Sequence, residues 1–355
     1  MIKFCNKMKT MDSKPKLDDV AALAKVSLST ASLALSDQGR LSAETRERVL
    51  EAAQSLGYRR RQRRPQAAAA DTRDIVMLFD IDPEWAMVLH LVRPIIQEFE
   101  RTLRQQGFNT LLLPISRSES TYEILEKIRC TQAIGVATIH FAPPELIVML
   151  ESAGIPVVVI MNSNFQDRFY TVCVDDFQGA YEGTSYLVKC GHLRIGYVDC
   201  LRPDLPVLPV DRFFGFMKAI GEYHLEFDDS MRRRISLEDD DMTSQLIDDL
   251  IRAHPDISAV FALDDDVAVR VVSMLRRLGI DVPGRISVLS PGDMLDYSLC
   301  YVPQITTMRI DTTYMGRIAG QMLHNRIAHN PQELHVLKVK QQLVKRGSVR
   351  EITNS

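Results

Sequence analysis

Short apolar runs alternate with amphipathic segments over most of this chain, from about residue 74 to residue 290. Nearly continuous apolar runs, typical of strands buried on both faces, lie at 75–79, 111–114, 133–139, 156–161, 194–198, 259–263 and 287–289. Apolar residues at helical spacing predict helices at 92–106, 146–152, 179–189, 213–223, 244–253 and 267–278. Such β-α repeats fold into parallel sheets covered by helices on both faces. The number of strands favours two doubly wound sheets, with ligands bound at the carboxyl ends of the strands.

A second, shorter pattern near the N-terminus predicts two short helices. The residues expected on the buried face of the first helix are Val20, Ala21, Leu23 and Ala24. The turn Lys25-Val-Ser27 follows, and the Ser27 hydroxyl is placed to cap the second helix. That helix is expected to bury Ala31, Ala34 and Leu35, and to expose Leu28, Ser29, Ser32 and Leu33. The spacing suits both a DNA-binding helix-turn-helix and an ordinary helical hairpin, and these residues alone leave both interpretations open.

A third helix completes a small bundle. Ser42 is expected to cap this helix, and Gly57 is expected to end it. The apolar residues at helical spacing between them are Val49, Leu50, Ala53 and Leu56. Three helices in about 45 residues bury too little apolar surface for much stability alone, but they suffice beside a larger domain.

The net charge of −3 hides a strong asymmetry between the two ends of the chain. Residues 1–73 carry 15 Lys and Arg against 8 Asp and Glu, a net charge of +7, whereas the remainder carries 28 against 38, a net charge of −10. A basic head on an acidic body attracts polyanions through the head alone. Five arginines between Arg59 and Arg64, followed by Pro65 and four alanines, predict a linker. These arginines either contact DNA phosphates or form a solvated charge run.

Several kinds of chemistry lack the residues that they need. The six cysteines are scattered without a Cys-x-x-Cys pair and the histidines do not cluster, so we expect neither a metal site nor a disulfide framework. Glycine-rich phosphate motifs and nucleophile motifs are absent, so we expect no cofactor and no enzyme activity. No apolar run has the length of a signal peptide core or the roughly 18 residues of a membrane span. We therefore expect a cytoplasmic protein without a membrane partner.

Short motifs are spaced along nearly the whole chain. In the head they are Asp19-Val-Ala-x-Leu-Ala-x-Val-Ser27, Leu41-Ser-x-Glu-Thr-Arg-Glu-Arg-Val49 and Leu56-Gly-Tyr58. In the body they are Gly154-Ile-Pro-Val-Val158, Val174-Asp-Asp176 with Gly179, Gly191-His-x-Arg-Ile195, Arg212-x-x-Gly-Phe216, Val282-Pro283, Ile305-Thr-Thr-Met-Arg309, Met315-Gly-Arg317 and Leu343-Val-Lys-Arg-Gly-Ser348. Each motif is weak alone, but so many in order are highly specific. From Leu17 to Val349 the chain resembles the lactose-repressor/galactose-repressor (LacI/GalR) family of bacterial transcription regulators.

The resemblance implies a helix-turn-helix headpiece that binds DNA, a hinge, and a core like periplasmic sugar-binding proteins. In that family the core dimerises, and an effector bound between its two subdomains changes how the headpieces are spaced on a palindromic operator. The implied function is a homodimeric repressor of a carbohydrate-catabolic operon, with double-stranded DNA and a sugar or sugar phosphate as partners. The alternative is a sugar-binding or enzymatic α/β protein with an incidental helical extension. Because the chain ends seven residues beyond Ser348, we expect no tetramerisation helix.

The resemblance also implies the domain boundaries. A flexible tail is expected at 1–15, the headpiece at 16–58, a basic hinge at 59–73, the effector-binding and dimerisation core at 74–350, and a second tail at 351–355. Within the core, the first subdomain is expected at 74–172 and 301–329, and the second at 173–300 and 330–350.

The headpiece and hinge supply the expected DNA contacts. They are Ser27, Leu28, Ser29, Thr30, Ser32, Leu33, Arg59, Arg60, Arg61, Arg63, Arg64 and Ala67. The family commonly contacts bases from the first, second and sixth positions of the second helix, which are Leu28, Ser29 and Leu33 here. Arginine is common at the last of these, so contact of Leu33 with a thymine methyl would replace a hydrogen bond to guanine, and we expect an unusual operator. At the hinge, Ala67 replaces a leucine that wedges between bases and Pro65 disfavours a helix, so we expect less kinking of the DNA.

Five residues of the core are expected to contact the effector, namely Trp85, Met161, Arg212, Asp264 and Asp293. Arg212 matches an arginine that typically bonds a sugar hydroxyl or an anionic group. Asp264 opens a run of three aspartates, which we expect to cap a helix and supply an acceptor rather than hold a cation. Met161 and the sequence Ser290-Pro-Gly-Asp293 depart from positions where the family often has aspartates, so we expect a phosphorylated or less polar effector. Trp85, the single tryptophan, either stacks on a sugar ring or packs in the core.

Overall fold

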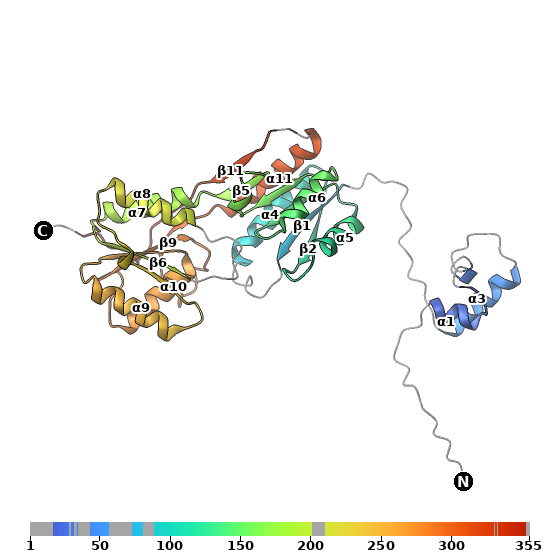
Figure 1. Ribbon diagram of the computed structural model, residues 1–355, viewed down its shortest axis with the longest axis horizontal. Coiled ribbons are helices and arrows are strands. Elements are labelled where there is room, and N and C mark those ends of the chain that lie inside the picture. Colours follow the sequence, from blue (N-terminus) through green and yellow to red (C-terminus); the bar gives the residue numbers. More distant parts are fainter. Residues whose placement is uncertain are drawn as a thin grey trace, which may run out of the picture. The chain divides into compact units, whose positions relative to one another are not determined.

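The computed structural model of the chain describes residues 17–27, 30, 31, 34, 43–56, 73–80, 89–200, 210–329, 331 and 333–352. The chain divides into two compact units, residues 1–71 and residues 72–355 (Figure 1). Among the described residues, those of the first unit form one small apolar core, and those of the second form a core on each face of its sheets.

The first unit is a small helical bundle. It contains α1 (Leu17–Leu23) and α3 (Ala43–Ser55), and residues 30, 31 and 34 between them are also helical. Its buried side chains are Val20, Ala21, Ala24, Ala31, Ala34, Val49, Ala52 and Ala53. Two predicted core residues are wrong, because Leu23 is 53% exposed and Leu50 is 49% exposed. Each leucine lies beside the apolar stripe of its helix, and in α3 the stripe continues through Ala52 instead.

The second unit contains two six-stranded sheets. The first sheet has the strand order β2-β1-β3-β4-β5-β11, and its strands pair in parallel. The strands are β1 (Asp74–Asp80), β2 (Asn109–Ile115), β3 (Gly135–Ile139), β4 (Val157–Ile160), β5 (Thr171–Val174) and β11 (Val336–Val339). The register of β1 is set by pairs such as Ile75 with Thr110 of β2 on one side and with Gly135 of β3 on the other.

The second sheet has the strand order β7-β6-β8-β9-β10-β12. Its strands are β6 (Ile195–Cys200), β7 (Arg232–Ile235), β8 (Ala259–Ala262), β9 (Ser287–Gly292), β10 (Thr306–Arg309) and β12 (Gln342–Val344). They are parallel except for the edge strand β12, which runs antiparallel to β10. The prediction of two doubly wound sheets with buried parallel strands is therefore confirmed.

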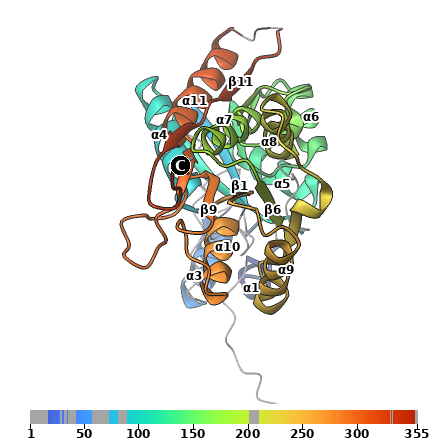
Figure 2. The same cartoon turned by 90° about the vertical axis from the view of Figure 1, so that its left-hand side faces the viewer.

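Helices cover both faces of each sheet (Figure 1, Figure 2). They are α4 (Leu89–Gln105), α5 (Thr121–Thr131), α6 (Pro144–Ser152), α7 (Asp176–Lys189), α8 (Val210–Glu222), α9 (Asp240–Ala253), α10 (Asp265–Arg277) and α11 (Thr312–His329), with 3-10 turns η2 (Ser163–Phe165) and η3 (Asp229–Met231). On the first sheet, α4 and α11 cover one face and α5 and α6 the other. On the second sheet, α7 and α8 cover one face and α9 and α10 the other.

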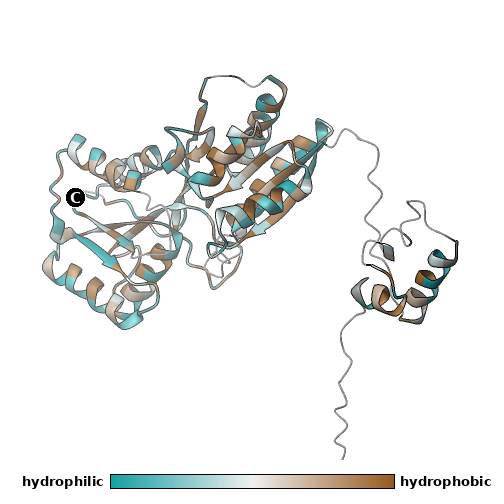
Figure 3. Ribbon diagram, turned by 45° about the vertical axis from the view of Figure 1, so that its right-hand side comes forward, coloured by the Kyte–Doolittle hydropathy of each residue, from teal (hydrophilic) through white to brown (hydrophobic). Residues whose placement is uncertain are grey.

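The central strands are apolar because both of their faces are buried. In β1, Ile75 and Met77 pack toward α4 and α11, whereas Val76 and Leu78 pack toward α5 and α6. Figure 3 shows the result, since the central strands are largely hydrophobic while helices carry one hydrophobic and one hydrophilic side. This burial on alternate sides explains why the central strands lack the polar–apolar alternation of a half-exposed sheet.

The chain crosses between the two sheets three times. The crossings lie between β5 and α7, between β10 and α11, and between β11 and β12. The predicted subdomain boundaries differ from this at two strands, because β10 pairs with β9 in the second sheet and β11 pairs with β5 in the first. Residues 306–309 therefore belong with the second subdomain and residues 336–339 with the first. Both segments are short, so only strand pairing shows to which sheet each of them belongs.

Three further findings concern the described residues of both units. No helix among the described residues is long and apolar enough to cross a membrane. Those residues contain no cluster of three or more His, Cys, Asp or Glu that would hold a metal ion. The cysteines with described positions, which are Cys130, Cys173, Cys190, Cys200 and Cys300, are free thiols.

Candidate functional site

The turn after α1 fixes the start of the next helix in the first unit. Lys25 has a left-handed backbone with φ of 52°, and the Val26 N–H donates to the Ala21 carbonyl at 3.0 Å, so α1 ends in a Schellman-type turn. The Ser27 Oγ then accepts a hydrogen bond from the Thr30 N–H at 3.1 Å. Ser27 therefore caps the second helix as predicted.

Most of the predicted DNA contacts lie outside the described residues. Within them, Ser27 is exposed and Thr30 is half-buried. The predicted contacts that lie outside are Leu28, Ser29, Ser32, Leu33, Arg59, Arg60, Arg61, Arg63, Arg64 and Ala67, together with the predicted effector contact Trp85.

Arg212 lies in the first turn of α8, and its side chain is only 11% exposed. Its Nε donates to the Asp176 Oδ1 at 2.8 Å, and its Nη1 donates to the Leu263 carbonyl at 2.7 Å. Burial lowers the pKa of Arg212, but the carboxylates of Asp176 and Asp264 outweigh it and raise the pKa above its usual value. The guanidinium therefore stays charged just beyond the carboxyl end of β8, where α/β proteins bind ligands.

Asp176 connects Arg212 to two of the chain crossings. It is the first residue of α7, immediately after the first crossing. Gln341, on the third crossing, donates from Nε2 to the Asp176 Oδ1 at 3.3 Å. The Gln341 N–H also donates to the Gln178 Oε1 at 2.8 Å, and the Gln178 Nε2 donates back to the Gln341 carbonyl at 3.2 Å. The Asp176 Oδ1 thus accepts from both Arg212 and Gln341. A ligand that draws Arg212 away from Asp176 would therefore change the contacts of the carboxylate that joins the first crossing to the third.

The carboxyl end of β8 also holds Asp264 and Asp265, the first two of three consecutive aspartates. The Asp264 Oδ1 accepts from the Val267 N–H at 3.0 Å and caps α10, as predicted. Asp265 is fully buried and accepts from the Ser290 Oγ at 2.9 Å and the Met294 N–H at 2.6 Å. Burial raises the pKa of Asp265 to about 7. Asp265 therefore ties α10 to the end of β9 as a buried carboxyl group.

Asp293 belongs to a separate cluster on β9, β10 and the segment after β12. Its buried carboxylate accepts from the Thr307 Oγ1 at 2.8 Å, from the Arg309 Nε, and from the Arg346 Nη2 at 2.5 Å. Burial raises the pKa of Asp293, but hydrogen bonds from Arg309, Thr307 and Arg346 outweigh it and lower the pKa. Three donors thus occupy this carboxylate within the second subdomain, whereas its contact with an effector stays a prediction.

Two residues with left-handed backbones follow adjacent strands of the first sheet. Met161 has a φ of 64° after β4, and His140 has a φ of 61° after β3. The Met161 N–H donates to the Val172 carbonyl at 2.8 Å, and its side chain packs on the first core. Burial, with a smaller effect of Arg117, lowers the pKa of His140 to about 4, so the imidazole is neutral. Positive φ in non-glycine residues costs free energy and concentrates at functional sites, which favours this edge of the sheet as a ligand surface.

A cavity of about 380 Å³ lies at the carboxyl ends of β6 and β7, beside α8. Its described lining residues are Tyr197, Asp199, Cys200, Val210, Phe213, Phe214, Arg232, Arg234 and Leu263. Arg232 and Arg234 both donate hydrogen bonds to Asp199. This cavity was not predicted from the sequence, although three consecutive arginines at 232–234 are a signal that points to it.

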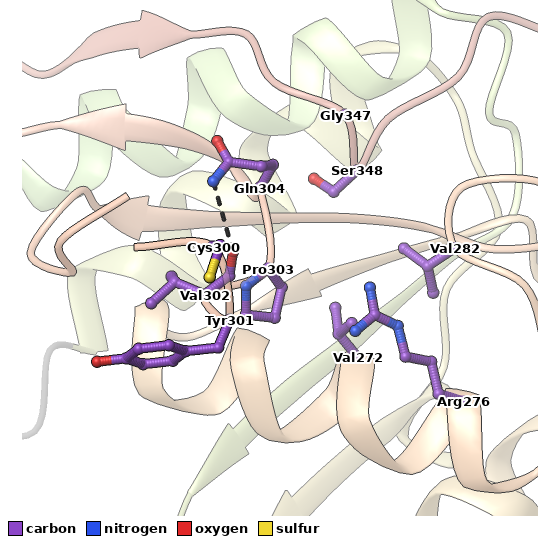
Figure 4. Close-up of a pocket in the computed structure, with 10 residues that line it drawn as sticks. All are labelled: Val272, Arg276, Val282, Cys300, Tyr301, Val302, Pro303, Gln304, Gly347 and Ser348. Carbon is purple, nitrogen blue, oxygen red and sulfur yellow. Dashed lines mark hydrogen bonds between the residues drawn. The ribbon is translucent and has the colours of Figure 1, made fainter. Parts of the chain in front are cut away.

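A second cavity of about 270 Å³ lies between α10 and residues 300–304 (Figure 4). Its described lining residues are Val272, Arg276, Val282, Cys300, Tyr301, Val302, Pro303, Gln304, Gly347 and Ser348. The Gln304 Nε2 donates to the Val302 carbonyl at 3.4 Å and holds this loop. The Tyr301 ring is directed away from the other labelled side chains in Figure 4 and is 77% exposed. The loop therefore presents an aromatic ring to its surroundings.

Two protein-family models match the chain. The model described as "Bacterial regulatory proteins, lacI family" matches residues 16–61, and the model described as "Periplasmic binding protein-like domain" matches residues 184–349. The first match covers the capped helical turn, and the second covers all six strands of the second sheet and Arg212, but not Asp176.

Individual proteins match nearly the whole chain. The HTH-type transcriptional repressor PurR of Mannheimia succiniciproducens is 25% identical over 347 residues, which cover 95% of this chain and 99% of PurR. The solved structure of the transcriptional regulator CelR–cellobiose complex is 25% identical with a TM-score of 0.65, covering 94% of this chain and 99% of that chain. The lac repressor dimer bound to operator and the anti-inducer ONPF shares the fold at 20% identity, with a TM-score of 0.64 and coverage of 95% and 100%.

Proposed function

Because the chain belongs to the lacI family of bacterial regulatory proteins, whose members regulate transcription and are not enzymes, we propose that it represses a carbohydrate-catabolic operon in the cytoplasm. The capped turn at Ser27 in the first unit carries the DNA-binding part of this proposal. The periplasmic-binding-protein-like core carries the effector-binding part. The alternative of an incidental helical extension does not account for a head that itself matches a family of regulatory proteins.

We expect selection from random DNA to return a palindrome whose half-site differs from the usual family half-site. Leu33→Arg is expected to shift one position of that half-site toward guanine, because arginine donates two hydrogen bonds to guanine and one such contact discriminates by about 1–3 kcal/mol. The measurement is sequencing of the selected DNA, followed by a salt titration of binding.

Leu50→Arg is the matched control for this experiment. It adds the same charge at an exposed position of α3, outside the second helix, so it is expected to leave the selected sequence unchanged. A wild-type chain that selects the ordinary family half-site, with no change in the Leu33→Arg variant, would contradict the proposal of an unusual operator.

The effector part of the proposal rests on Arg212. This guanidinium is charged and donates a hydrogen bond to Asp176, whose carboxylate also accepts a hydrogen bond from Gln341. An effector oxygen that accepts from Arg212 competes with Asp176, and this favours one arrangement of the crossings over another. The cellobiose of the CelR–cellobiose complex supports a carbohydrate effector, and a sugar phosphate is the anionic version of the same ligand class.

We expect Arg212→Gln to weaken effector binding by at least about tenfold, because it removes a charge-assisted hydrogen bond. The measurement is a thermal-shift screen of sugars and sugar phosphates, followed by titration of the ligand that stabilises the wild-type chain. Lys218→Gln is the control, since Lys218 is exposed on the same helix and pairs with Glu222. Equal affinity of the Arg212→Gln and wild-type chains for that ligand would exclude Arg212 from the effector site.

Exposed apolar side chains support the proposal of a homodimer. Leu111 and Leu112 are 37% and 50% exposed on β2, which is an edge strand of the first sheet. Leu299 and Tyr301 are also exposed, and Tyr301 lines the cavity of Figure 4. Exposed edge strands and apolar patches are typical association surfaces. A dimer also accounts for two headpieces on one palindrome.

A further inference from the structure

We propose that the cavity beside β6, β7 and α8 binds a small organic anion with an apolar body, such as an aromatic carboxylate, at a site separate from that of Arg212. Its volume of about 380 Å³ lies within the range of small-molecule pockets. Arg212 and Asp264 are not among its described lining residues. The described residues of the cavity and of the Arg212 site therefore present different groups to a ligand, although the two sites adjoin at Leu263 and at Tyr197, which interacts electrostatically with Arg212.

Among the described residues that line the cavity, the charged groups carry one positive charge in excess. Asp199 is 8% exposed and accepts from the Arg232 Nε at 3.1 Å and from the Arg234 Nε at 3.2 Å. One carboxylate neutralises only one of these two guanidinium groups. Each guanidinium has five N–H donors, and Asp199 accepts no more than two from each of them. The remaining donors suit a planar carboxylate, which arginine binds through paired hydrogen bonds.

The rest of the described lining is apolar and aromatic. Phe213 and Phe214 lie on α8, and the Arg232 Cζ lies 4.1 Å from the Phe213 ring centroid, so the guanidinium covers one face of that ring. Phe214 is 59% exposed and so leaves apolar surface for a ligand. The only other polar groups on the described lining side chains are the Tyr197 hydroxyl and the Cys200 thiol. This lining matches a flat ring with one acidic group and offers too few partners for the hydroxyls of a sugar.

The test is calorimetric titration of the full chain with sodium benzoate at constant ionic strength. We expect saturable binding of benzoate and much weaker binding of benzyl alcohol, which has the ring without the charge, and of acetate, which has the charge without the ring. Arg234→Gln is expected to weaken benzoate binding by about tenfold. This variant is expected to fold, because Arg234 is half-exposed on an edge strand.

Arg233→Gln is the matched control, since Arg233 lies between the two cavity arginines on β7 and bonds to the carbonyls of Ser230 and Arg232 instead. It is expected to bind benzoate as the wild-type chain does. Absence of saturable benzoate binding at about 10 mM, equal binding of benzyl alcohol, or equal weakening in the Arg233→Gln and Arg234→Gln variants would each overturn the proposal. Operator binding and the effector affinity of the Arg212→Gln variant are measured separately, so failure of this test leaves the proposed function standing.

Discussion

Replacing Gly316 by alanine is expected to destabilise the core by about 2–3 kcal/mol. Gly316 lies on α11, and a Cβ atom there would lie 2.3 Å from the Ile95 carbonyl oxygen and 3.0 Å from the Ile95 Cα of α4. Backbone atoms cannot rotate away as a side chain does, so the two helices would have to separate. The higher helix propensity of alanine offsets about 1 kcal/mol of this cost. The measurement is urea unfolding followed by circular dichroism.

Gly221→Ala is the control for that result. Gly221 lies in α8, and a Cβ atom there would meet no atom within 4 Å. Alanine is therefore expected to stabilise the chain there by up to about 1 kcal/mol through helix propensity alone. A Gly316→Ala variant as stable as the Gly221→Ala variant would mean that α4 and α11 do not pack as closely as the structure has them.

A close helix contact at a glycine also occurs in the second subdomain. A Cβ atom at Gly215 of α8 would lie 2.2 Å from the Phe177 carbonyl oxygen of α7. Gly215 and Gly316 both belong to motifs by which the chain resembles the LacI/GalR family, Arg212-x-x-Gly-Phe216 and Met315-Gly-Arg317. Close contact of one helix pair on each sheet therefore gives a packing reason for two of the family motifs.

Burial explains why several strands of the fold were predictable from the sequence, although the exposed edge strand β2 was also predicted and the buried strand β5 was not. The central strands β1, β4 and β8 are covered on both faces, so their apolar runs stand out. The edge strands β7 and β11 were missed because each carries polar and partly exposed residues, with one fully buried position apiece. The helix α5 was missed as well, although Ser120 and Glu123 form a capping box at its start.

The residues of the candidate site fall into two groups, those that contact their neighbours in the sequence and those that contact distant residues. Ser27 and Asp264 cap the helices that follow them, and this local role is legible in the sequence. The bond from Gln341 to Asp176 joins residues 165 positions apart, so the link between Arg212 and the crossings needs the folded chain. The effector contact of Asp293 stays a prediction, and the two arginines that pair with this carboxylate come from other strands and segments. Non-local ion pairs leave no periodic trace in a sequence.

Asp265→Asn is expected to make the stability of the core less dependent on pH between about pH 5 and pH 8. Burial raises the pKa of Asp265 to about 7 in the folded chain, from an ordinary value near 3.8. Asparagine has nearly the same shape, and it can accept from the Met294 N–H and donate to the Ser290 hydroxyl. It therefore keeps both contacts without a charge to bury.

The sign of this effect follows from proton binding. Folded Asp265 holds its proton more tightly than unfolded Asp265, so its contribution to stability is fully present below about pH 4 and is lost as the pH rises toward 7. Relative to the wild-type chain, Asp265→Asn is expected to gain about 3 kcal/mol in the free energy of unfolding between pH 5 and pH 8. Urea unfolding at a series of pH values measures this difference.

At Asp293 the arginines lower the pKa, so its carboxylate stabilises the fold above its ordinary pKa and this contribution is lost as the pH falls. Asp293→Asn should therefore lose stability at neutral pH, and a loss of the same size and sign in both variants would contradict the assignment of a buried, readily protonated carboxyl to Asp265.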